Sequence, residues 1–110
     1  MARPAIGLAS GGPALFAYLL QSMAEEAARS NPELSLDLAC KLAQETAGAT
    51  MNLIKEANMT TEEIVRRVAV PGGMTALAIE ILSRYLPQAW QSMFRETAER
   101  ESKARESLVL

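Results

Sequence analysis

The residues with the clearest chemical potential lie in one short segment, Val68 to Thr75, with the sequence Val-Ala-Val-Pro-Gly-Gly-Met-Thr. Pro71, Gly72 and Gly73 form a turn signal directly before a helical pattern, and Thr75 falls in the first turn of that helix. Glycines there let backbone N–H groups approach a ligand, and the positive end of the helix dipole favours an anion. The segment therefore predicts a site for a small acidic ligand, most simply a carboxylate. A plain connection between two helices remains the alternative on these residues alone.

The residue types that are missing narrow the chemistry further. The 110 residues include no histidine and one cysteine, which excludes the common zinc sites and the Ser-His-Asp and Cys-His catalytic units. Eleven basic and thirteen acidic residues give a net charge of −2, and only five residues are aromatic. Neither a basic nucleic-acid footprint nor a platform for base stacking is therefore expected.

The chain carries no sequence signal for a membrane or for secretion. No apolar run reaches the ~20 residues that span a bilayer, and the N-terminus lacks a signal-peptide pattern. A single cysteine forms no internal disulfide framework, which suits a reducing compartment. We therefore expect a soluble cytoplasmic protein.

The elements that must position the Pro-Gly-Gly segment read as helices throughout, because apolar residues recur at spacings of three and four. We expect one all-α domain over residues 1–110, with a lead-in at 1–8 and a frayed tail at 106–110. Five helices are predicted, at about residues 13–29, 35–57, 60–70, 73–85 and 87–105. Thr60 and Glu63 have the spacing of a capping box at the start of the third helix. Leu86-Pro87 is expected to end the fourth helix and start the fifth.

The second helix presents an unusually small surface at Ala43, Ala47 and Gly48. A glycine inside a helix costs about 0.5–1 kcal/mol relative to alanine, so a close helix–helix approach is the expected reason for it. The wide apolar faces of the first two helices exceed what one copy can cover, and uncovered apolar surface favours pairing. We predict a five-helix bundle that forms an interlocked homodimer, with the surface around Gly48 at close contacts. Cys40, in the same helix, is expected to be a small buried residue rather than a reactive thiol.

Three blocks of sequence carry a resemblance to a known family. Residues 8–14 read Leu-Ala-Ser-Gly-Gly-Pro-Ala, Thr46 is followed by Ala49, and residues 68–82 contain Pro-Gly-Gly-Met-Thr-Ala-Leu-Ala-Ile. In this order and spacing, the chain resembles the C-terminal dimerisation domain of pyrroline-5-carboxylate reductase, over about residues 5–105. The resemblance implies a fold like the C-terminal domain of 6-phosphogluconate dehydrogenase.

The resemblance also implies a function. The family consists of NAD(P)H-dependent reductases of proline biosynthesis, in which a Rossmann domain carries the nucleotide and the helical domain interlocks with a second copy. The imine substrate lies between them, with its carboxylate at the turn before the threonine-bearing helix. Carried over to this chain, Thr75 contacts the substrate as the catalytic residue, and the substrate-binding residues are Val70, Gly72, Gly73, Met74 and Thr75. The implied partners are a second copy and a small carboxylate imine, with neither nucleic acid nor membrane.

Departures from the family pattern leave two functions open. No G-x-G-x-x-G follows a strand, so the nucleotide domain is expected to be absent and the chain alone to be an incompetent reductase. Val70 stands where the family places a serine, and Gln21 replaces a family glutamate. A hydrogen bond to a charged group is worth about 1.5–3 kcal/mol, so the missing hydroxyl weakens carboxylate binding about tenfold or more. The chain is thus either a reductase fragment or a non-enzymatic helical dimerisation module with a degenerate site.

Overall fold

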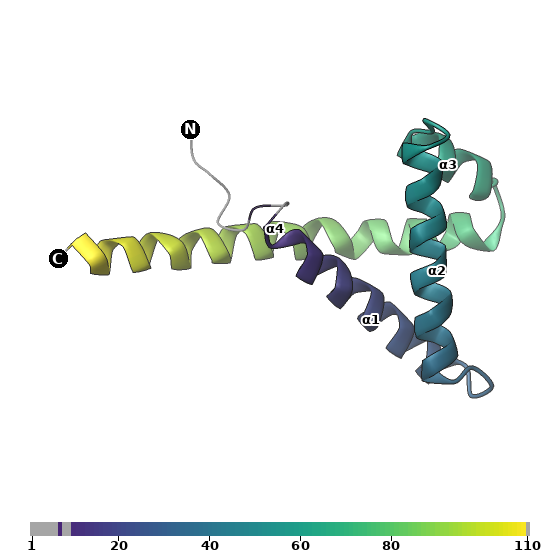
Figure 1. Ribbon diagram of the computed structural model, residues 1–110, viewed down its shortest axis with the longest axis horizontal. Coiled ribbons are helices and arrows are strands. Elements are labelled where there is room, and N and C mark those ends of the chain that lie inside the picture. The colour runs from purple at the N-terminus through teal and green to yellow at the C-terminus, as the bar shows by residue number, and fades with distance from the viewer. Residues whose placement is uncertain (1–6, 8–9, 110) are drawn as a thin grey trace. The chain divides into compact units, whose positions relative to one another are not determined.

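The structure is a computed structural model that describes residues 7 and 10–109 of the chain. Within these residues it is all helical and contains no strand, as predicted. The helices are α1 (Gly12–Ser30), α2 (Leu36–Lys55), α3 (Thr61–Val68) and α4 (Met74–Val109), coloured from purple to yellow in Figure 1. The chain divides into two compact units, residues 13–66 and residues 1–12 with 67–110, and each is described by itself.

The prediction of five helices was wrong, because the fourth and fifth are one continuous helix, α4, with Pro87 inside it. A proline within a helix loses one hydrogen bond and crowds the carbonyl of residue i−4, here Ser83, at about 3 kcal/mol. Ending the helix there would instead leave up to four carbonyls and four amides without partners, and Leu86 is a poor N-cap. Residues 74–109 contain no glycine and no second proline that would help to end the helix. The single defect is therefore tolerated.

The ends of the chain were predicted to be irregular. Of the expected lead-in, residues 1–8, only Gly7 lies within the described residues. Helix α4 continues to Val109, and Leu110 lies outside the described residues.

In the unit of residues 13–66, small side chains line the contact between α1 and α2. Ala24 on α1 and Ala39 on α2 are the two buried apolar residues in the described part of the chain, with 1% and 4% of their surface exposed. Helix α2 begins where predicted, since the Ser35 hydroxyl caps it by accepting a hydrogen bond from the Leu38 amide at 3.1 Å. It ends at Lys55, and Asn58 beyond it adopts a left-handed conformation with φ of 55°.

The predicted capping box at the start of α3 is confirmed. The Thr60 hydroxyl accepts a hydrogen bond from the Glu63 amide, and the Glu63 carboxylate accepts one from the Thr60 amide, both at 3.1 Å. Two of the amides that a helix start leaves without partners are thereby satisfied. The four residues between this box and the end of α3 include Arg66 and Arg67, so the helix is short and strongly charged on one side.

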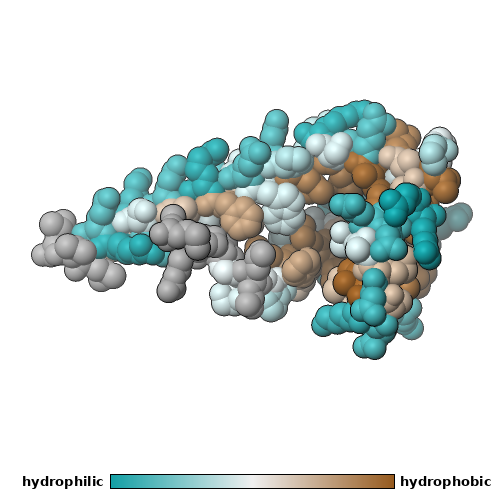
Figure 2. All heavy atoms as spheres, turned by 90° about the horizontal axis from the view of Figure 1, so that it is seen from above, coloured by the Kyte–Doolittle hydropathy of each residue, from teal (hydrophilic) through white to brown (hydrophobic). Residues whose placement is uncertain are grey.

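The most consequential property of the fold is how little apolar surface it covers. Among the described residues, eighteen large hydrophobic side chains are exposed, from all four helices and the loop before α4. Hydrophobic side chains, brown in Figure 2, accordingly lie open on the surface. Gly48 is exposed, and apart from its chain neighbours and the backbone of its own helix no described atom lies within 4 Å of where its Cβ would be. The structure therefore does not show the predicted close approach at Gly48 among the described residues, and its contact between copies stays a prediction.

Candidate functional site

The segment that the sequence singled out folds as a tight turn. The Val70 carbonyl accepts a hydrogen bond from the Gly73 amide at 3.0 Å, which closes a four-residue turn. Gly72, its third residue, has φ of +81°. Proline at the second position and a positive φ at the third define a type II turn, and only glycine enters that conformation without strain. The backbone geometry therefore requires Gly72 and favours Pro71.

This turn delivers the chain into α4 with its first amides uncommitted. The first hydrogen bond of the helix runs from the Leu77 amide to the Gly73 carbonyl, at 3.2 Å. The amides of Met74, Thr75 and Ala76 precede it, so they have no acceptor inside the helix. Three N–H groups at the positive end of the longest helix described are thus available to an acceptor from outside.

The side chains around these amides are open to solvent. Val70 is 54% exposed and Met74 is 77% exposed, and Pro71, Gly72 and Thr75 are exposed as well. Within the described part of the chain, the Thr75 hydroxyl makes no hydrogen bond. A ligand at the start of α4 would therefore meet free amides and a free hydroxyl.

Gly73 differs from the other predicted site residues. Its amide is already used by the turn, so it offers no donor to a ligand. A Cβ on this residue would stand 3.2 Å from the Val70 carbonyl oxygen and 3.3 Å from a γ-carbon of Val70. A side chain at position 73 would therefore crowd Val70, and glycine avoids this contact. The Pro-Gly pair predicts this turn type from the sequence. The turn type in turn predicts that the Gly73 amide is hydrogen-bonded within the turn.

The turn and the first residues of α4 carry no charged side chains. Residues 68–79 contain no charged side chain, and Arg67 and Glu80 flank them. Attraction to an anion thus comes from the backbone, and a helix dipole contributes about 0.3–1 kcal/mol at an exposed surface. The turn and the start of α4 can orient a carboxylate, but they supply only part of a binding site.

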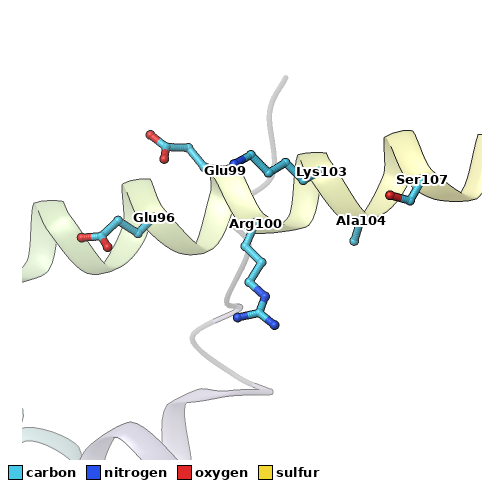
Figure 3. Close-up of a pocket in the computed structure, with 6 residues that line it drawn as sticks. All are labelled: Glu96, Glu99, Arg100, Lys103, Ala104 and Ser107. Carbon is cyan, nitrogen blue, oxygen red and sulfur yellow. The ribbon is translucent and has the colours of Figure 1, made fainter.

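Two other places with polar side chains are weaker candidates for a functional site. The hollow of Figure 3 is lined by residues of α4 alone, and the side chains of Glu99 and Arg100 extend to opposite sides of the helix. It is the outer surface of a charged helix rather than an enclosed site. Cys40 is half-buried, less than predicted, and its thiol donates to the Gln21 side-chain oxygen at 3.5 Å across the α1–α2 contact. Gln21, which replaces a family glutamate, thus faces a thiol in the structure.

Neither metal ligation nor membrane insertion finds support in the described residues. They contain no cluster of three or more histidine, cysteine or acidic side chains that could hold a metal ion. None of their helices is long and apolar enough to cross a membrane.

Comparisons with known proteins agree with the resemblance drawn from the sequence. The family described as "Pyrroline-5-carboxylate reductase dimerisation" matches residues 2–104. Pyrroline-5-carboxylate reductase 3 of Bacillus subtilis (strain 168) is 30% identical over 93 residues, which are 84% of this chain and 34% of that protein. The chain thus spans about a third of the length of this relative. No solved structure gives a significant match. Because the family match covers nearly all of the residues, the chain belongs to the pyrroline-5-carboxylate reductase dimerisation family.

Proposed function

We propose that the chain is the dimerisation and substrate-carboxylate-binding part of an NAD(P)H-dependent, pyrroline-5-carboxylate reductase-like imine reductase. The observation that carries the proposal is the near absence of a core in a chain of a dimerisation family. Among the described residues, two apolar side chains are buried and eighteen large ones are exposed. A second copy is the simplest cover for such a surface.

The size of the exposed surface supports an interlocked dimer over a slight contact. Burying a large apolar side chain completely contributes about 1.5–3 kcal/mol. Because these side chains are roughly half exposed, covering each of them would contribute about half of that free energy. Covering most of them therefore yields on the order of 15 kcal/mol, which compares with an association cost of about 4–15 kcal/mol. A contact through a few of them would fall short of this cost. The two compact units are thus proposed to act as one domain once paired.

The carboxylate part of the proposal depends on the start of α4. The amides of Met74 and Thr75 would donate to the substrate carboxylate, and Gly72 would hold the turn that keeps them clear. The Thr75 hydroxyl would donate a further hydrogen bond and orient the ring for reduction. Val70 and Gly73 would form the wall beside the ligand, since a γ-carbon of Val70 occupies the space next to Gly73 where a Cβ would otherwise stand.

The nicotinamide nucleotide does not fit the residues described here. Dinucleotides bind at the carboxyl ends of parallel strands, and the described residues form no strand. The chain has no G-x-G-x-x-G motif either. The proposed contribution of this chain is therefore the positioning of the substrate, not the transfer of hydride. We also propose a cytoplasmic location, because the single cysteine suits a reducing compartment.

A second candidate function is a helical dimerisation module that has lost the site. It is favoured by Val70, which is 54% exposed and offers an apolar side chain where a hydroxyl would strengthen carboxylate binding. Both candidates share the dimer, so only ligand binding separates them.

Two measurements test the proposal in turn. Sedimentation velocity at low micromolar concentration is expected to give a dimer, and a monomer would contradict both candidates. The ¹⁵N-labelled dimer is then titrated with proline, with proline amide as the control that lacks the carboxylate. Saturable shifts at Gly72, Met74 and Thr75 with proline alone support the reductase reading, and their reduction in Thr75→Val assigns the hydroxyl. A dimer without such shifts favours the module.

A further inference from the structure

We draw no further inference here: the strongest candidate, the apolar hollow between α1 and α2 in the unit of residues 13–66, where Ala24 and Ala39 are buried and Met23 and Leu42 are exposed, carries nothing, because nothing in the structure shows what covers it.

Discussion

Replacing Gly72 by alanine tests the turn on which the candidate site depends. The structure gives this residue φ of +81°, and apart from its chain neighbours no described atom lies within 4 Å of its Cβ position, so the added methyl group meets no steric obstacle beyond the local backbone. The expected loss is therefore the cost of holding an L-residue in the left-handed region, about 1–2 kcal/mol. At a fixed protein concentration, this corresponds to a lower midpoint of urea unfolding and to about 4–8 °C in Tm for each kcal/mol.

The mirror-image residue supplies the matched control. D-alanine at position 72, introduced by chemical ligation, carries the same methyl group but favours a positive φ. It is expected to lose nothing and to gain about 0.4–1 kcal/mol, because it restricts the unfolded chain. Gly72→Asn should fall between the two, since asparagine tolerates the left-handed region better than alanine. Equal stability of the L- and D-alanine proteins would refute the type II turn and with it the exposed amides of α4.

Three further predictions follow from the helices. Pro87→Ala restores one hydrogen bond inside α4 and is expected to raise the free energy of unfolding in urea, by up to about 3 kcal/mol less the ~1 kcal/mol that proline gains from a restricted unfolded chain; a loss would show that α4 bends at this residue for a purpose. Thr60→Ala removes half of the capping box and should cost about 0.5–2 kcal/mol, whereas the exposed neighbour Thr61 changed to alanine should cost far less by the same measurement. Gly48→Ala should weaken the dimer in sedimentation equilibrium, since overpacking a contact costs about 1–3 kcal/mol; a dimer more stable by about 0.5–1 kcal/mol would mean that the helix alone sets the effect.

The parts of the fold that sequence predicted well are those that neighbouring residues decide. The Ser35 cap and the Thr60–Glu63 box each involve groups three residues apart, so no distant contact was needed to predict them. The prediction that a helix ends at Pro87 was wrong, because the local preference of proline competes with a larger cost. Ending the helix there would leave up to eight backbone groups without hydrogen-bond partners, and that cost arises only because α4 continues on both sides of Pro87. The predicted helix–helix contact at Gly48 also depends on residues that are distant in sequence. The described residues place no neighbour against it, so its contact with a second copy stays a prediction.

The same division applies to the candidate site. The turn and the free amides follow from Pro71 and Gly72, but a segment without charged side chains gains only about 0.3–1 kcal/mol from the helix dipole toward an anion. Affinity for a carboxylate must therefore come mostly from groups outside this segment, and we propose that the partner copy supplies some of them. If so, ligand and dimer are linked, because a ligand that binds only the paired form stabilises it by RT ln(1 + [L]/Kd), about 2.7 kcal/mol at a hundredfold excess over Kd. Proline should accordingly tighten the dimer in proportion to its occupancy. A ligand that shifts the amides of α4 but leaves the dimer's dissociation constant unchanged would mean that the site is complete in one chain.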